Sequence, residues 1–179
     1  METEGKDGRM FKIGQYVSCG NKGVCTVENI TTLDISGVDK EKMYYILKPY
    51  YMAASTVYVP VDSSATSMRP ILTREEAEAL IASIPDIPML TIQNEKFVEQ
   101  DYRNSMKSNR CEEWVRIIKT IYERKQKRLQ AGRKETAVDS KFFKIAEDNL
   151  YGELAIALEM ERGEMQEYIS GQLQGFHTV

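Results

Sequence analysis

The residue types that most often carry out chemistry are scarce and scattered in this chain. It has three cysteines, Cys19, Cys25 and Cys111, and one histidine, His177, close to the C-terminus. A structural zinc site needs about four Cys or His ligands at paired spacings, and Cys19 and Cys25 have no matching second pair. A serine or cysteine nucleophile needs a base held beside it, whereas chain ends usually fray. We expect no metal, no cofactor and no enzymatic activity.

Phosphate-binding and membrane-binding signals are also missing from the sequence. The segment CGNKG, which contains Gly20 and Gly23, has neither the spacing nor the Lys-Ser/Thr ending of a P-loop, so we expect no small-molecule substrate. The segment METEGKDGR lacks the apolar core of a signal peptide, and we find no apolar run long enough for a membrane span. The odd, scattered cysteines favour a reducing compartment, with their thiols as small core residues. We expect a cytoplasmic protein with no membrane partner.

Basic residues, in contrast, are concentrated in one segment. The overall charge is −3, but residues 116–134 hold eight basic residues against the single acid Glu123, a net charge of +7. Residues 147–167 hold seven acids against Arg162, a net charge of −6. A cationic surface of this kind can contact the phosphate backbone of a duplex. The alternative is that these charges only solvate the outer face of a helix.

Helical periodicity sorts this segment into two faces. At about 100° per residue, one side is predicted to pack in a core, and it carries Trp114, Ile118, Ile121 and Leu129. The other side is predicted to be exposed and to contact DNA together with the loop that follows. Its basic residues, with those of the loop, are Arg116, Lys119, Arg124, Lys127, Arg128, Arg133 and Lys134.

The elements that must position these residues differ between the two halves of the chain. From Met10 to about Val61 short runs rich in Val, Ile, Tyr and Thr alternate with turn signals, which predicts four or five strands of a small barrel. In the last run Val57 and Val59 should share one face and Tyr58 the other, and Pro60 should end the pairing. Gly14 and Gly23 should occupy turns or bulges with positive φ.

The second half is predicted to be helical. Thr73 has the properties of an N-cap for a helix over 73–84. Further helices are expected over 94–108, 112–129 and 136–158, with a short one near 165–170. Gly132 is suited to a left-handed C-cap, and Thr136 to Asp139 resembles a capping box. The short basic loop between the two longest helices predicts that they lie antiparallel in a compact bundle.

These patterns predict an α+β chain of two domains. We expect a disordered extension over 1–9 and a small Tudor/SH3-like β-barrel over 10–66. An all-α helical bundle follows over 67–179, with helix 73–84 as its connector.

The residues of both halves resemble one family in order and spacing. The segment CEEWVRIIKTIYERKQKRLQAGRKETAVDSKFFKIAEDNLYGELAIAL is similar to the C-terminal domain of the CarD/CdnL family of bacterial transcription regulators. The segment MFKIGQYVSCGNKGVCTVENI, followed by TVYVPVD, is similar to the Tudor-like polymerase-interacting domain of the same family. The resemblance covers about Met10 to Leu158.

The resemblance implies two partners and no reaction. The barrel would bind the β subunit of RNA polymerase, and the helical domain would contact double-stranded promoter DNA and stabilise the open complex, in the bacterial nucleoid. The family's polymerase-binding positions fall on Tyr58 and near Leu33. The Tyr-basic pair of its first long helix falls on Tyr102 and Arg103, which adds Arg103 to the DNA-binding candidates.

The sequence departs from the family at positions where the family contacts DNA. The family's wedge tryptophan falls on Val98, with Phe97 beside it, and an arginine pair is replaced by Gln100 and Asp101. An apolar Phe97 can still unstack a base step in the minor groove, or it can pack in the core.

Two other functions remain open from the sequence. A divergent paralogue that acts only as a protein-protein interaction module would bind no DNA. A small hydrolase or transferase would require an unexpected cluster of buried carboxylates.

Overall fold

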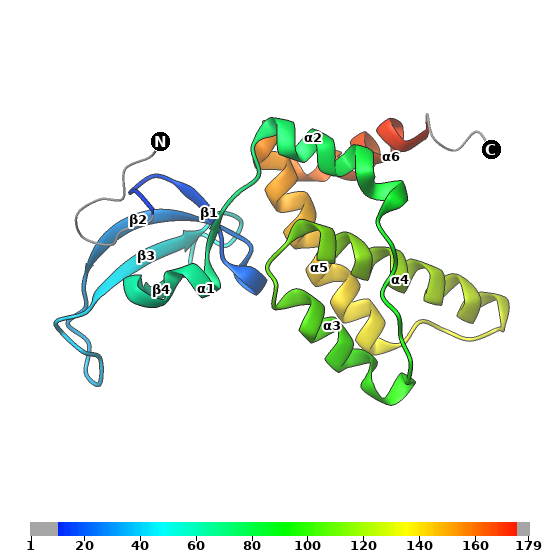
Figure 1. The fold of residues 1–179 in the computed structure, drawn as a ribbon, viewed down its shortest axis with the longest axis horizontal. Coiled ribbons are helices and arrows are strands. Elements are labelled where there is room, and N and C mark those ends of the chain that lie inside the picture. The colour runs from blue at the N-terminus through cyan, green and yellow to red at the C-terminus, as the bar shows by residue number, and fades with distance from the viewer. Residues whose placement is uncertain (1–10, 175–179) are drawn as a thin grey trace. The chain divides into compact units, whose positions relative to one another are not determined.

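The computed structural model describes residues 11–174, and the chain divides into two compact units between Ile71 and Leu72. The expected extension over 1–9 and His177 lie outside the described residues. The first unit is built mainly from strands and the second from helices (Figure 1). The coarse expectation of a strand-rich part followed by helices is therefore confirmed.

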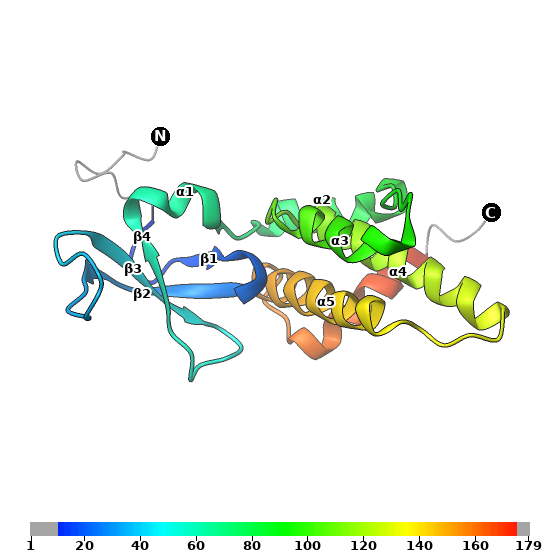
Figure 2. The ribbon, with the colours of Figure 1, turned by 90° about the horizontal axis from the view of Figure 1, so that it is seen from below.

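The first unit is a curled antiparallel sheet of five strands with the order β4-β3-β2-β1-β5. The small barrel that we expected is a half-barrel, because β4 and β5 lie at opposite edges of the sheet. It is consistent with a Tudor-like domain, and its curl is visible in Figure 2. The strands are β1 Tyr16–Ser18, β2 Val24–Thr32, β3 Met43–Pro49, β4 Val57–Pro60 and β5 Arg69–Pro70. A 3-10 turn at Val61–Ser63 and the short helix α1 Ser64–Ser67 connect β4 to β5.

Glycines and a bulge shape the curl of this sheet. Gly14 has φ +88° and Gly23 has φ +70°, which confirms the predicted turns. The pairing of β2 with β3 shifts between Val27 and Asn29, so one extra residue stands in β2. Such a bulge bends a strand and increases its twist.

The core of the first unit lies on one face of the sheet. It includes Val17, Val27, Tyr45 and Leu47, all fully buried. The Tyr45 hydroxyl accepts a hydrogen bond from the backbone amide of Phe11 at 3.2 Å, so its buried polar atom has a partner.

The cysteines Cys19 and Cys25 lie in this core, as expected. Burial raises the pKa of Cys25 to about 12 and also raises the pKa of Cys19. Both thiols stay protonated near neutral pH, which makes them weak nucleophiles.

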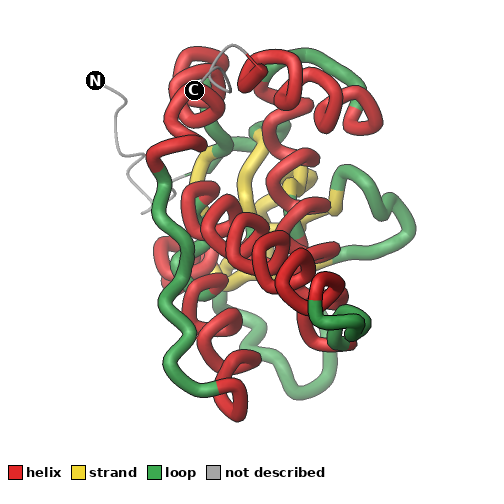
Figure 3. Tube along the Cα trace, turned by 90° about the vertical axis from the view of Figure 1, so that its right-hand side faces the viewer, coloured by secondary structure: helices red, strands yellow, loops and turns green. Residues whose placement is uncertain are grey.

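The second unit contains the predicted helices, with shifts of a few residues at their ends (Figure 3). A segment without regular structure, residues 88–94, leads from α2 and the turn after it to α3. The helices are α2 Arg74–Ser83, α3 Val98–Met106, α4 Cys111–Gln130, α5 Ala137–Ala157 and α6 Met165–Gln174. The 3-10 turns Ile84–Asp86 and Glu95–Phe97 lie between α2 and α3, and the 3-10 turn Arg162–Glu164 lies between α5 and α6.

The packing of α4 confirms most of its predicted core face. Trp114 is 1% exposed and Ile121 is fully buried, with Ile118 partly buried against the same core. The prediction that Leu129 packs in the core is wrong, because this residue is 53% exposed. The last turns of α4 project beyond the packed helices (Figures 1 and 2), so they have little core to cover.

The predicted helix caps are present. Thr73 caps α2 in a reciprocal box with Glu76. Gly132 ends the α4 region with φ +71°. The Thr136 hydroxyl accepts a hydrogen bond from the backbone amide of Asp139 at 3.1 Å, which is one half of the capping box expected there.

Removing the cap of α5 should weaken the helical unit. We expect Thr136→Ala to lower the free energy of unfolding by about 1 kcal/mol, because an amide of the first turn loses its acceptor. Urea unfolding followed by the fluorescence of Trp114 measures this change. Thr136→Ser keeps the hydroxyl and should stay close to wild type; equal losses in both variants would show that the hydroxyl is not the stabilising group.

Candidate interaction surfaces

An exposed tyrosine marks the edge strand β4. Tyr58 is 47% exposed, whereas its neighbour Val59 is 7% exposed, which confirms the predicted alternation. β4 pairs with β3 through Tyr58 opposite Ile46, and its other side pairs with no strand among residues 11–174. The strand therefore presents backbone groups and an aromatic side chain at the edge of the sheet.

The second residue predicted to contact the polymerase is not available for this role. Leu33, just beyond the end of β2, is only 8% exposed. The prediction for Leu33 came from its match to a polymerase-binding position of the family and took no account of burial. Its side chain contributes to packing, and Tyr58 remains the exposed candidate.

A group of exposed aromatic residues on the first unit was missed by sequence reasoning. Tyr16 on β1 and Tyr50 after β3 have ring centroids 5.8 Å apart, and Tyr50 and Tyr51 have centroids 4.9 Å apart, both pairs edge to face. Tyr16 is 39% and Tyr50 is 49% exposed. The signal in the sequence is the pair Tyr50-Tyr51, but the contact with Tyr16 depends on strand pairing.

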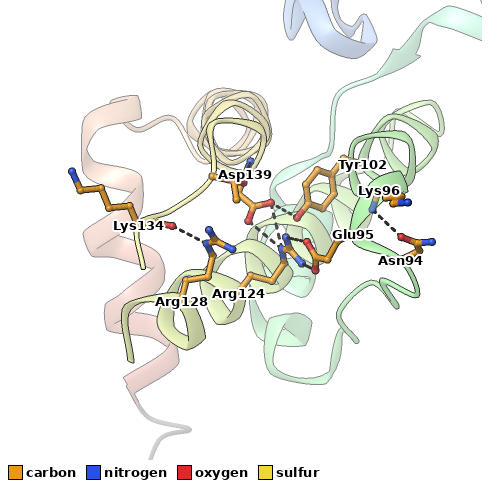
Figure 4. A network of polar contacts seen from close by, with 9 residues as sticks. Asn94, Glu95, Lys96, Tyr102, Arg124, Arg128, Lys134 and Asp139 are labelled. Atoms are coloured by element: carbon orange, nitrogen blue, oxygen red, sulfur yellow. Dashed lines mark hydrogen bonds and ion pairs between the residues drawn. The ribbon is translucent and has the colours of Figure 1, made fainter. Parts of the chain in front are cut away.

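Arg124, predicted to face solvent and DNA, lies at the centre of an internal network (Figure 4). Its Nε donates to Asp139 Oδ2 at 3.1 Å, and its two Nη atoms donate to Glu95 Oε1 and Oε2 at 2.6 and 2.9 Å. The Tyr102 hydroxyl donates to Asp139 Oδ1 at 2.8 Å. Asp139 is fully buried and the Arg124 side chain is 16% exposed. The prediction that Arg124 is exposed is therefore wrong.

The electrostatics of this network fit a structural role. The hydrogen bond from Arg124 lowers the pKa of Glu95, so Glu95 stays ionised. Burial raises the pKa of Tyr102, and its hydrogen bond to Asp139 raises it further. Buried Asp139 thus has a cation and a hydroxyl as partners, which a buried carboxylate requires.

Lys119 and Arg116 are also held by the protein itself. Lys119 Nζ donates to the carbonyl oxygens of Ile84 and Ile87 at 2.9 and 2.6 Å. Arg116 donates to Glu113 at 3.0 Å and to the carbonyl oxygen of Pro88 at 3.2 Å. The chain around residues 84–90 thus contacts the face of α4 that was predicted to be open, and the predicted exposure of Lys119 is wrong.

Exposed positive charge remains at the end of α4 and in the loop that follows. We call this group the basic tip. In Figure 4 the Lys134 side chain points away from the network, while its carbonyl accepts from Arg128 Nε at 2.7 Å. Two acids lie close by: Glu123 pairs with Lys127 at 2.9 Å and Glu135 with Lys125 at 3.5 Å. The basic tip consists of the exposed residues Lys125, Lys127, Arg133 and Lys134 together with Arg128, which is partly buried.

The two remaining DNA-contact candidates lie in and around α3. Phe97 is 61% exposed, so the expectation that it could pack in the core is wrong. Arg103 donates to Glu99 at 2.6 Å, and its guanidinium lies 5.6 Å from the ring centroid of Phe142. The charge of Arg103 is therefore largely balanced within the helical unit.

Two carboxylates are buried in α5, but they do not form a cluster. Asp139 and Glu153 are both fully buried and stand 14 positions apart on one helix, which corresponds to roughly 21 Å. Glu153 accepts from the backbone amide of Leu72 at 2.9 Å and from Cys111 Sγ at 3.4 Å. These contacts stabilise the fold and give no support to the hydrolase or transferase alternative.

The described part of the chain offers neither a metal site nor a membrane-spanning helix. Residues 11–174 contain no group of three or more His, Cys, Asp or Glu side chains placed to hold a metal ion. Among the same residues, no helix has both the length and the apolar character needed to cross a bilayer.

Comparison with known families identifies the first unit. Residues 11–72 match the CarD-like/TRCF RID domain, a protein-interaction family rather than a catalytic one. No curated protein matches the chain. The matched range coincides with the half-barrel, β1 to β5, and it supports a role related to transcription. Residues 11–72 form a CarD-like/TRCF RID domain.

Proposed function

We propose that this protein is a bacterial transcription regulator that binds the β subunit of RNA polymerase through its half-barrel. The match of residues 11–72 to the CarD-like/TRCF RID domain is the observation that carries this proposal. The protein would act in the cytoplasm, at the nucleoid. It would need no cofactor, because binding alone changes the stability of a promoter complex.

The geometry of β4 supports its use as the polymerase-binding element. An edge strand presents amide and carbonyl groups in register, and a strand of a partner can pair with them. Tyr58 provides an aromatic side chain next to this edge, and such side chains often dominate the binding energy of an interface. The N-terminal unit therefore combines backbone pairing with a side-chain anchor.

For the helical unit we propose a weak, sequence-tolerant contact with promoter DNA through the basic tip, which would stabilise the open complex. The supporting observation is the group of exposed cations at the end of α4 and in the loop after it. Surface ion pairs such as that of Lys127 with Glu123 have a small interaction free energy. The acids Glu123 and Glu135 therefore do not prevent contact between the basic tip and phosphates. Arg116, Lys119 and Arg124 are not part of the proposed DNA surface, because backbone carbonyls or several carboxylate oxygens of the protein hold them. Arg103 lies on α3, outside the basic tip.

The internal contacts of Lys119 and Arg124 favour one second candidate. These two residues do not extend the basic tip. If the basic tip alone does not bind DNA, the protein acts as an interaction module that binds only proteins. This candidate predicts polymerase binding with no salt-dependent affinity for DNA. Titration with a promoter duplex distinguishes the two.

Charge reversal in the basic tip should remove DNA binding. We expect replacement of Lys127, Arg133 and Lys134 by Glu to weaken duplex binding at least about tenfold. The slope of log binding constant against log salt should also fall by about 0.9 for each phosphate that the variant no longer neutralises. Titration of a labelled promoter duplex at several salt concentrations measures both quantities.

The matched control carries the same change of charge on the other unit. Lys12, Lys40 and Lys42 are exposed on the half-barrel, and their replacement by Glu should leave the salt slope unchanged. The wild type and this control should prolong the lifetime of open complexes challenged with a competitor, and the basic-tip variant should not. Equal losses in both triple variants, or no duplex binding by the wild type, would contradict the proposed DNA contact.

A further inference from the structure

A polar cleft with one exposed aromatic ring lies at the start of α3. Its volume is about 450 Å³, and it is lined by Thr91, Gln93, Asn94, Phe97 and Asp101. All five residues belong to the helical unit. They lie in the irregular segment before α3, in the 3-10 turn Glu95–Phe97 and in the first turn of α3. The cleft lies outside the basic tip, and the proposed function does not use it.

The turn that presents Phe97 is held in place by specific contacts. Asn94 Oδ1 accepts a hydrogen bond from the backbone amide of Lys96 at 2.9 Å. Glu95 is bound by both Nη atoms of Arg124, as Figure 4 shows. Phe97 is 61% exposed despite this fixed backbone. A large apolar ring kept in solvent on a braced turn is suited to contact with a ligand.

Asp101 is the one charged residue among those that line the cleft. Of the three carboxylates close to Phe97 in the sequence, Glu95 pairs with Arg124 and Glu99 pairs with Arg103. No ion pair involves Asp101 among residues 11–174, although Asp101 lines the cleft itself. Lys96 is the neighbouring cation in the sequence, but it does not line the cleft.

We propose that this cleft binds the guanidinium group of an arginine side chain from a partner protein. A guanidinium stacks on an aromatic face and donates two parallel hydrogen bonds to a carboxylate. Phe97 provides the face, and Asp101 provides a carboxylate that has no other cation. The side-chain oxygens of Thr91 and Gln93 are acceptors for the remaining N–H groups. A phosphate backbone would be repelled by Asp101, so the charge favours a basic protein segment over a nucleic acid.

The test uses small probes and the full chain. The probes are N-acetyl-arginine-amide and its neutral counterpart N-acetyl-citrulline-amide, titrated into the ¹⁵N-labelled protein and followed by the amide resonances of residues 91–101. We expect saturable shifts at these residues with the arginine probe and none with the citrulline probe. Equal shifts with both probes would overturn the proposal.

Two variants and a matched control locate the contact. Asp101→Asn should weaken binding of the arginine probe about tenfold, as expected for loss of a charge-assisted hydrogen bond. Phe97→Ala should weaken it about threefold, in line with an exposed cation–π contact. Asp86→Asn removes an exposed acid outside the cleft and should have no effect. Because Asp101 lies in the first turn of α3, thermal unfolding of each variant verifies that the fold is kept.

Other occupants give different results, and each would overturn the proposal. Free arginine binding much more tightly than the blocked probe would indicate a metabolite site. Shifts that grow with protein concentration and disappear in Arg133→Ala would indicate a second copy of this chain. Tighter binding of a single-stranded oligonucleotide at the same residues would indicate a nucleic-acid site.

Discussion

Replacing Arg124 by Ala should lower the free energy of unfolding of the helical unit by about 3 kcal/mol, because it leaves a buried carboxylate without its cation. Asp139 is fully buried and receives hydrogen bonds from Arg124 and Tyr102. The same change removes the two hydrogen bonds from Arg124 to Glu95, which connect the turn before α3 to α4. Urea unfolding followed by Trp114 fluorescence measures the loss, since the only tryptophan is buried in this unit.

Lys127→Ala is the matched control for Arg124→Ala. Lys127 is a basic residue of the same helix with a 71% exposed side chain, and its loss should change stability by no more than about 0.5 kcal/mol. Tyr102→Phe removes one hydrogen bond to Asp139 and should cost about 1 kcal/mol. If Arg124→Ala and Lys127→Ala have the same free energy of unfolding, the network does not contribute to stability and our description of this face of α4 is wrong.

Tyr58→Ala should weaken binding to the polymerase β subunit by more than about 1 kcal/mol, or more than about fivefold, if Tyr58 is an anchor of the interface. The side chain is 47% exposed, so its removal costs the free protein little packing. Calorimetric titration of the full chain with the isolated β lobe of the cognate polymerase measures the change.

The control for Tyr58 is an exposed tyrosine on the other unit. Tyr122 on α4 is 60% exposed, and Tyr122→Ala should leave the affinity for the β lobe unchanged. A small and equal effect of both substitutions would make Tyr58 an ordinary residue of the edge strand.

Local features of the fold could be predicted from the sequence because neighbours in the chain determine them. Thr73 and Thr136 cap helices through amides three residues further on, and Gly132 takes the left-handed conformation that favours glycine. The alternation of Tyr58 and Val59 follows from strand geometry alone. The burial of Trp114 follows from helical periodicity in the same way.

The environment of the basic helix could not be predicted in this way. Periodicity assigns Lys119 and Arg124 to one face, but it does not say which distant segment covers that face. Residues 84–90 do so in part: the Leu90 amide donates to Thr120 Oγ1 at 2.8 Å, and Lys119 reaches carbonyls more than 30 positions away. This segment has no periodicity, so its packing has no signal in the sequence. The same reason explains why Leu33 is buried and Leu129 is exposed, both against our predictions. The exposure of each depends on where the neighbouring elements end.

Binding of the half-barrel to RNA polymerase is the claim on which the proposed function depends. Its most direct test is retention of the isolated β lobe on the immobilised full chain and on a chain reduced to residues 72–179, with Trp114 fluorescence to verify that the shorter chain is folded. We predict that the full chain retains the lobe and the shorter chain does not. Failure of the full chain to retain it, or equal retention by both chains, would contradict the account.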